Sequence, residues 1–454
     1  MFVDRIAAAG FSVWQFLPLG PTHAHGSPYE SMSSFAGNPD MLDLRECLKF
    51  GWLTATEFEQ GSDLVEIRTL AAKGFWRHAE REPELAAAVT AFEKAHADWL
   101  DDYALFAALK KAYRDRPWWE WPDVLRDRDA DALAQARIDY SDWIKQNIFE
   151  QLLFERQWHA LKKHAEAQGV QMFGDLPIYV AHDSADVWTN QSYFTINRIG
   201  LCDEVAGVPP DYFSDSGQRW GNPLYKWDTM EADGFQWWIK RVGRQLDRMQ
   251  MLRIDHFRGL EAYWAIPGNS EDGVIGEWRE APGKALLDAL KNAFGSLPLI
   301  AEDLGIITDN VTALREAFAL PGMKILQFAF GGDENNPYLP KNHEENSVVY
   351  TGTHDNDTTL GWLTSTNEST RQNALQTLAA KVDDMPWALI DCALASPARL
   401  TVIPMQDLLE LGSEARFNTP GTLDGNWQWR LDSIPAADAY CWQYAHKLNR
   451  KYNR

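Results

Sequence analysis

The sequence has few cysteines and no long apolar run. Its 454 residues include four cysteines, Cys47, Cys202, Cys392 and Cys441, and their spacing matches no metal or redox motif. This disfavours a disulfide framework and indicates reduced thiols in a cytoplasmic protein. The apolar stretch FSVWQFLPLG near the start is too short to span a bilayer, and no basic segment precedes it as in a secretory signal. We therefore expect a cytoplasmic protein without a membrane partner.

Positive charge is also scarce. Lys and Arg number 43 against 65 Asp and Glu, which gives a formal net charge of -22. Proteins that bind nucleic acids need basic patches for the phosphates, so this balance argues against a nucleic-acid partner. No glycine-rich phosphate loop follows an expected strand, and nucleotide binding is therefore unsupported as well.

Tryptophan, in contrast, is abundant, with 21 in the chain. Most of them are expected in the core. Several stand beside Gly, Asn, Asp and Pro in expected loops, as in GQRWGNPLYKW and DGNWQWR. Aromatic faces are the usual platform for the apolar faces of sugar rings, so these loop tryptophans indicate a sugar ligand.

Seven short apolar runs alternate with amphipathic helical segments, which predicts an α/β fold with a parallel sheet. The runs cover residues 12–20, 170–180, 251–257, 297–305, 323–331, 347–355 and 399–409. Doubly wound and barrel architectures both fit this pattern. Polar residues at the carboxyl ends of nearly all the runs favour a (β/α)8 TIM-type barrel. Residues 55–170 look helical throughout and predict a helical insertion within a single catalytic domain that spans 1–454.

Three acidic residues close three of these runs and are candidates for catalysis. In RIDHFRG, Arg253 and Asp255 fall on one face of a strand, so Arg253 is expected to hold the Asp255 carboxylate ionised as a nucleophile. Glu302 follows an apolar strand and is expected to stay protonated as a general acid. Asp355 closes the run VVYTGTHD. Ion pairs on a barrel rim are the competing interpretation, but three acids at one mouth favour the cleavage of glycosidic bonds.

Motifs along most of the chain resemble the 4-alpha-glucanotransferases, the amylomaltases or disproportionating enzymes of glycoside hydrolase family 77. The resemblance extends from Phe2 to the C-terminal region. It is carried, in family order, by SPYESMSSFAGNP, GDLPIYVAHDSADVW, GVPPDYFSDSGQRWGNPLYKW, RIDHFRG, AEDLG, PGMKILQFAF, TGTHDN and NTPGT with NWQWR. RIDHFRG alone indicates only the wider alpha-amylase clan, whereas the combination is specific.

The resemblance implies a retaining transfer of alpha-1,4-glucan segments between maltodextrins, starch or glycogen-derived chains. Asp255 would form a covalent beta-glucosyl enzyme, Glu302 would act as acid and then as base, and Asp355 would bind sugar hydroxyls. Arg253 and His354 would support the same sugar. Further subsite residues would be Tyr29, Asp175, Gln218 and Trp220. The family requires neither a metal nor a cofactor.

The segment 200–230 is expected to be a lid over the active site. Its loop contains the aromatic residues Tyr212, Phe213 and Trp220 as cover. Its candidate hinges are the glycines at 207, 217 and 221. Transfer requires that a glucan hydroxyl compete with water for the intermediate, and a closing loop would exclude water.

The resemblance also implies that the first strand of the barrel is missing, because Met1 lies within what resembles the first helix of the family. An open barrel exposes two strand edges, so we expect the natural protein to begin upstream and the 454-residue form to be weakly active.

Two functional hypotheses therefore remain: an active glucanotransferase, or an N-terminally truncated, inactive or weakly active glucan-binding relative. Hydrolysis, as in the alpha-amylase clan, is a minor third.

Overall fold

Parallel strands form the centre of the molecule, as the sequence predicts. The computed structural model describes residues 1–210, 215–422 and 424–454. One four-stranded parallel sheet contains, in spatial order, β1 (Val13–Gln15), β2 (Gln171–Leu176), β5 (Met251–Ile254) and β8 (Leu299–Ala301). A three-stranded parallel sheet contains β11 (Leu400–Val402), β10 (Ser347–Tyr350) and β9 (Gly322–Ile325). Each of the seven predicted apolar runs contains one of these strands, so the α/β prediction is confirmed.

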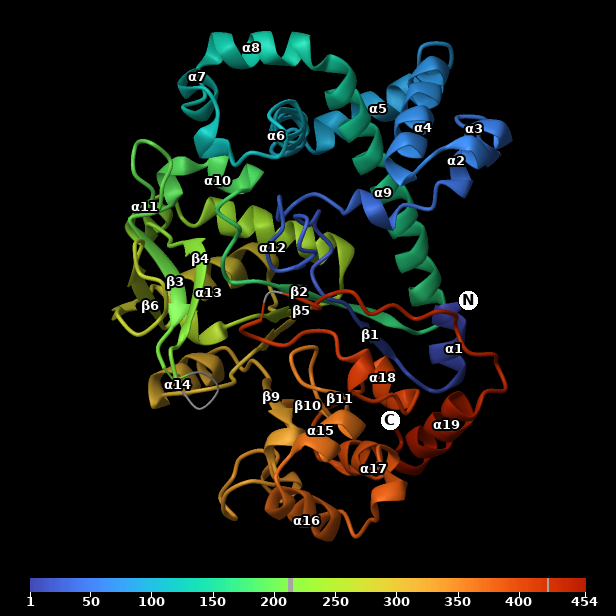
Figure 1. Ribbon diagram of the computed structural model, residues 1–454, viewed down its shortest axis with the longest axis vertical. Helices are drawn as coiled ribbons and strands as arrows, with labels where there is room; N and C mark the ends of the chain where they lie inside the picture. The colour runs from blue at the N-terminus through green and yellow to red at the C-terminus, as the bar shows by residue number, and fades with distance from the viewer. Residues whose placement is uncertain (211–214, 423) are drawn as a thin grey trace.

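Helices alternate with these strands and pack around them (Figure 1). The N-terminal helices are α1 (Phe2–Ala8) and α2 (Arg45–Lys49). Those that follow β2 are α10 (Ala185–Thr189), α11 (Trp227–Ala232), α12 (Gln236–Arg248), α13 (Gly283–Phe294), α14 (Asp309–Ala317), α15 (Thr359–Ser365), α16 (Glu368–Thr377), α17 (Trp387–Ala395), α18 (Met405–Leu408) and α19 (Tyr440–Tyr452). Apolar residues at helical spacing, such as Trp238 and Val242 on α12 and Leu286 and Leu290 on α13, are buried in the main core. Their burial fixes the helices against the sheet.

A long helical segment separates β1 from β2 and gathers at one end of the molecule (Figure 1). It contains α3 (Ala55–Gln60), α4 (Leu64–Ala79), α5 (Pro83–Ala95), α6 (Leu100–Ala112), α7 (Asp123–Arg126), α8 (Ala130–Asp139) and α9 (Ser141–Ala167). Part of it has a small core of its own, in which the fully buried rings of Phe75 and Phe149 lie 4.9 Å apart. Helix α9 also reaches the main core through Phe154 and Trp158, so it joins the two parts.

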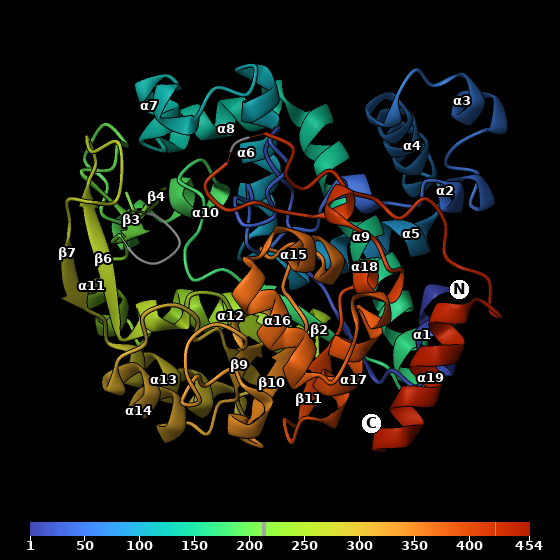
Figure 2. The same ribbon diagram turned by 60° about the horizontal axis from the view of Figure 1, so that its bottom comes forward.

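A third sheet lies beside the parallel strands and is antiparallel (Figure 2). Its order is β4 (Gln218–Pro223), β3 (Glu204–Val208), β6 (Ala262–Pro267) and β7 (Glu277–Glu280). Part of the segment 200–230 is therefore strand rather than loop, and its role as a lid stays a prediction. Prolines and glycines obscure the alternation of β3 and β4 in the sequence, and the pairing of β3 with β6 depends on contacts between distant parts of the chain. Tyr212 and Phe213, the expected cover of the lid, lie outside the described residues.

Among the described residues, the two parallel sheets join on one side only. The Ala301 backbone N–H donates to the Pro321 carbonyl at 2.9 Å where β8 meets β9. On the other side, within the described ranges, β1 pairs only with β2 and β11 only with β10. A cavity of about 310 Å³ lies between β1 and β11, lined by Trp14 and Phe16 on one side and by Val402 and Ile403 on the other. The barrel is thus open between β1 and β11 in the described residues. No described helix is both long enough and apolar enough to cross a membrane.

Helices α1 and α19 lie side by side, and one buried hydrogen bond joins them (Figure 1). The Asn449 side-chain amide donates to the Ala9 carbonyl at 2.9 Å, and both residues are buried. We predict that Asn449→Ala lowers the free energy of unfolding by about 1–3 kcal/mol, because it leaves that carbonyl without a partner. His446→Ala, on the exposed face of the same helix, is the control and should cost less than about 0.5 kcal/mol. Equal losses in urea unfolding would contradict this role of Asn449.

Candidate active site

Three of the predicted acids, Asp175, Asp255 and Glu302, meet Arg253 at the carboxyl ends of three adjacent parallel strands. Asp175 lies on β2, Arg253 on β5, Asp255 directly after β5 and Glu302 directly after β8. The strand register places Asp175 opposite Arg253. Because the carboxyl ends of parallel strands form one rim, these side chains converge there.

Arg253 is the buried centre of this cluster. Its Nε lies 3.4 Å from an Asp175 carboxylate oxygen, and its Nη2 contacts the Asp255 carboxylate, the pairing that strand alternation predicts. The Arg253 and Asp175 side chains are 4% and 0% exposed, whereas Asp255 keeps 29% of its side chain exposed. Burial raises the pKa of Asp175 to about 7, although Arg253 opposes this. Burial on its own lowers the pKa of Arg253, but Asp175 and other nearby acidic groups raise it well above its ordinary value. Of the two acids that Arg253 pairs with, only Asp255 faces the open site.

Glu302 is held by the turn that follows Asp255. His256 adopts a left-handed conformation with φ of 51°, and its backbone N–H donates to Glu302 Oε2 at 2.6 Å. The Leu304 N–H donates to the other carboxyl oxygen at 3.1 Å. Burial first, and then the charge of Asp255, raise the pKa of Glu302 to about 8. Glu302 is therefore mainly protonated at neutral pH and oriented by two backbone donors.

Asp355 lies on the opposite side of the cluster and is joined to it through His354 and Tyr29. Its Oδ1 accepts a hydrogen bond from the Asn418 amide at 2.7 Å and lies 3.3 Å from His354 Nε2. The His354 ring stacks on Tyr29 with ring centres 5.2 Å apart, and the Tyr29 hydroxyl donates to Asp175 at 2.6 Å. Burial lowers the pKa of His354, so its ring is mainly neutral at neutral pH. A continuous chain of contacts thus links Asp355 to the Arg253 centre.

Gln218 and Trp220 reach the site from the antiparallel sheet. The Trp220 indole N–H donates to the Gln218 side chain at 3.1 Å, so the two residues orient each other. The Trp220 ring lies 4.8 Å from the His256 ring, edge to face. Strand β4 therefore lies beside the turn that connects Asp255 with Glu302.

Several residues of the cluster were not identified as individual site residues from the sequence. Asn418 and Arg416 fix Asp355, the latter by a 2.8 Å bond to its backbone carbonyl. The Trp427 ring lies within about 6 Å of both Tyr29 and His354. The NTPGT and NWQWR motifs contain Asn418 and Trp427, so the motif signal was present. Tyr338 is different: burial, followed by the charges of Asp303 and Glu302, raises its pKa to about 12, and no motif marks it.

Two histidines, His23 and His25, stand close together in the N-terminal loop. His23 and His25 lie 5.9 Å apart between ring centres, and His25 faces Glu30 at 3.2 Å. Across the described ranges, no group of three or more His, Cys, Asp or Glu side chains is arranged to hold a metal ion.

Comparisons of the sequence and of the fold with known proteins give one consistent result. A sequence model of the 4-alpha-glucanotransferase family matches residues 1–435. The chain is 47% identical over 450 residues to a 4-alpha-glucanotransferase of Thermus thermophilus, covering 95% of this chain and 89% of that protein. It is 43% identical over 449 residues to a 4-alpha-glucanotransferase of Synechocystis, covering 94% and 88%. An amylomaltase from Streptococcus agalactiae in complex with acarbose superposes with a TM-score of 0.94 at 33% identity, covering 100% of this chain and 94% of that structure.

We predict that Glu302→Gln stabilises the protein increasingly as pH rises. The carboxyl pKa is about 8 in the folded protein against an ordinary value of 4.5, so between these values only the folded state holds the proton. The stability of the wild type must therefore fall as pH rises through this window, whereas glutamine does not titrate. Thermal midpoints measured at about pH 5 and about pH 8 should show a larger gain at the higher pH. The exposed Glu316→Gln is the control, and a gain independent of pH at position 302 would contradict the prediction.

Proposed function

Because this chain belongs to the 4-alpha-glucanotransferases of glycoside hydrolase family 77 and is a glucanotransferase enzyme, we propose that it acts by a retaining mechanism on Asp255 and Glu302. It moves segments of alpha-1,4-glucans between maltodextrins, including those derived from starch or glycogen. The observation that supports this most directly is the pairing of two acids in different environments. Asp255 contacts Arg253, whereas Glu302 is a neighbouring acid whose pKa is raised to about 8.

Asp255 is the nucleophile in this proposal. One of its carboxylate oxygens bonds to the anomeric carbon of the donor sugar while the glycosidic bond breaks. The leaving sugar oxygen takes the proton of Glu302, so charge does not accumulate on the leaving group. The product is a beta-glucosyl ester of Asp255 with an ionised Glu302.

The second displacement restores the alpha configuration. The 4-hydroxyl of an acceptor glucan attacks the anomeric carbon, its proton passes to the Glu302 carboxylate, and the Asp255 ester bond breaks. Two inversions at one carbon give net retention. The backbone donors of His256 and Leu304 hold Glu302 in place through both steps.

Asp355, His354 and Tyr29 bind the sugar at the cleavage point in this proposal. Asp355 keeps 46% of its side chain exposed, so its carboxylate is available to sugar hydroxyls. Trp220 and Gln218 on β4, together with Trp427, line the flanking subsites. Aromatic side chains around the intermediate favour a bound glucan acceptor over water.

We predict disproportionation of maltotriose. The pure protein should release glucose and form a ladder of longer maltodextrins, because the glucanosyl intermediate passes to a second glucan. Chromatography of the products, with reducing ends measured in parallel, checks this. A steady rise in reducing ends without longer products would indicate hydrolysis instead.

We predict that Asp255→Asn lowers kcat by roughly three orders of magnitude or more, while maltodextrins still bind, because the amide is isosteric but a poor nucleophile. A fluorinated glucosyl donor that traps the intermediate should label Asp255 in a peptide map of the wild type. Asp288→Asn, on the outer helix α13 and paired with Lys284, is the control and should retain activity. A label on Asp355 would refute the assignment.

A further inference from the structure

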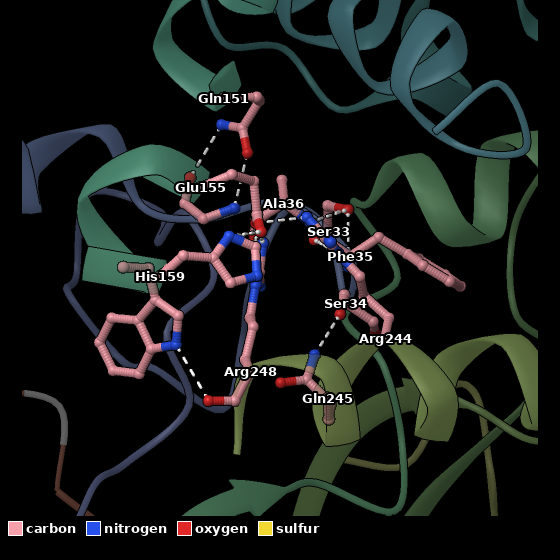
Figure 3. Close-up of polar contacts among 12 residues, drawn as sticks. Ser33, Ser34, Phe35, Ala36, Gln151, Glu155, His159, Arg244, Gln245 and Arg248 are labelled. Carbon is pink, nitrogen blue, oxygen red and sulfur yellow. Dashed lines mark hydrogen bonds and ion pairs between the residues drawn. The ribbon is translucent and has the colours of Figure 1, made fainter. Parts of the chain in front are cut away.

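The segment from Ser34 to Gly37 lies between α9 and α12 and belongs to no helix or strand (Figure 3). Its carbonyls are nevertheless all bonded, each by a side chain of one of these helices. The donors are Gln245 Nε2 to Ser34 O at 2.7 Å, Arg244 Nε to Phe35 O at 3.2 Å, Arg248 Nη1 to Ala36 O at 3.4 Å and Gln151 Nε2 to Gly37 O at 2.9 Å. Four consecutive carbonyls are thus fixed by tertiary contacts alone.

The backbone N–H groups of this segment are bonded as well. The acceptors are Asp186 Oδ2 for Ser34 at 2.8 Å, Ser33 Oγ for Phe35 and Ala36 at 3.1 and 3.2 Å, and Gln151 Oε1 for Gly37 at 2.7 Å. The fit is also tight, because a Cβ added at Gly37 would lie 2.2 Å from the Phe154 ring. Burial of a loop is costly when its backbone polar groups stay unpaired, but here each N–H and carbonyl of residues 34–37 has a partner.

A buried ionic cluster orients two of the side chains that donate to the loop, Arg244 and Arg248. Glu155 accepts from Arg248 Nη2 at 2.6 Å and contacts Arg244 through the same carboxylate oxygen, and all three side chains are at most 6% exposed. Burial alone raises the pKa of Glu155, but the two arginines together lower it below its ordinary value. Two guanidiniums on one carboxylate hold a fixed geometry, and each still directs an N–H at the loop. Burying such charges costs free energy. We therefore expect the cluster to position the loop rather than to add to the net stability of the fold.

The other end of the same loop carries Tyr29. The Met32 N–H donates to Pro21 O and the Asn38 N–H to Leu19 O, both at 2.8 Å, so residues 19–38 close on themselves. The base of this closed loop is the segment 34–37, and its tip contacts Asp175 and His354 through Tyr29.

We propose that Gln151, Glu155, Arg244, Gln245 and Arg248 form a clamp that positions Tyr29 for glucan transfer. None of these residues is needed to touch substrate; they act through the loop. The proposal rests on the proposed function, in which Tyr29 lines the sugar site. A shift of about 1 Å at a substrate-positioning group can cost on the order of a hundredfold in rate. A loss of contacts at residues 34–37 that displaces Tyr29 would therefore lower the rate of transfer.

The chain offers a matched pair of variants for the test. The Gln151 side chain accepts a hydrogen bond from the Gly37 N–H and donates one to the Gly37 carbonyl. The Gln157 side chain, on the same helix α9, makes the same two bonds with the Asp43 backbone, at 3.0 and 2.9 Å. Gln151→Ala should lower kcat for maltotriose disproportionation about tenfold, with a smaller change in KM, whereas Gln157→Ala should change kcat less than about twofold. Gln245→Ala, which removes one bond to Ser34, is the milder second variant if Gln151→Ala folds poorly.

A double-mutant cycle with Tyr29→Phe separates positioning from a merely structural role. If the clamp acts through Tyr29, then Gln151→Ala should lower kcat less than about twofold in the Tyr29→Phe background. Additive losses, or equal effects of Gln151→Ala and Gln157→Ala, would overturn the proposal. So would a Tyr29→Phe variant with full activity.

Hydrogen exchange tests the clamp without relying on activity. Gln151→Ala should speed exchange at residues 23–32, and Gln157→Ala should not. Unchanged exchange there would overturn the clamp even in an active enzyme. If the wild type shows no glucan transfer, the proposed function is rejected. Faster exchange at residues 23–32 in Gln151→Ala would still support the placement of Tyr29 by the clamp.

Discussion

The buried guanidinium of Arg253 is the interaction on which the rest of the site depends. It faces Asp175 across the β2–β5 register and contacts Asp255 at the end of its own strand. Removing either Arg253 or Asp175 would leave a buried charge without its partner, so the charged forms of these two side chains depend on each other. Their fixed arrangement leaves Asp255 open to the site while Glu302, on the next strand, is mainly protonated at neutral pH. Two carboxyl groups on one rim thereby acquire different chemical properties.

The parts of the site are supported in different ways. Asp255 and Glu302 follow directly on buried strands, and the hydrogen bonds of the sheet fix their backbones. Tyr29 instead lies on a loop that has no sheet to support it, and the helices α9 and α12 supply its support from outside (Figure 3). A loop that carries a functional residue usually needs such anchoring by a scaffold.

The parallel strands could be located from the sequence because they have local signals, whereas the catalytic roles of the acids stay predictions. Short apolar runs between amphipathic segments located all seven parallel strands, and alternation predicted the Arg253–Asp255 contact. Strands β3 and β4 were missed because their pairing with β6 is long-range and their sequence is rich in glycine and proline. The bonds of Gln151 to Gly37, 114 residues away, have no local signature either. Side chains that satisfy distant backbone groups cannot be identified before the fold is known.

Glu302 keeps its proton at neutral pH because of burial and the charge of Asp255. An infrared or carbon-13 titration of the Glu302 carboxyl, in the wild type and in Asp255→Asn, tests this. We expect a pKa of about 8 for Glu302 in the wild type and a lower pKa when the Asp255 charge is removed. A Glu302 carboxyl that titrates near its ordinary value of 4.5 in both proteins would contradict it.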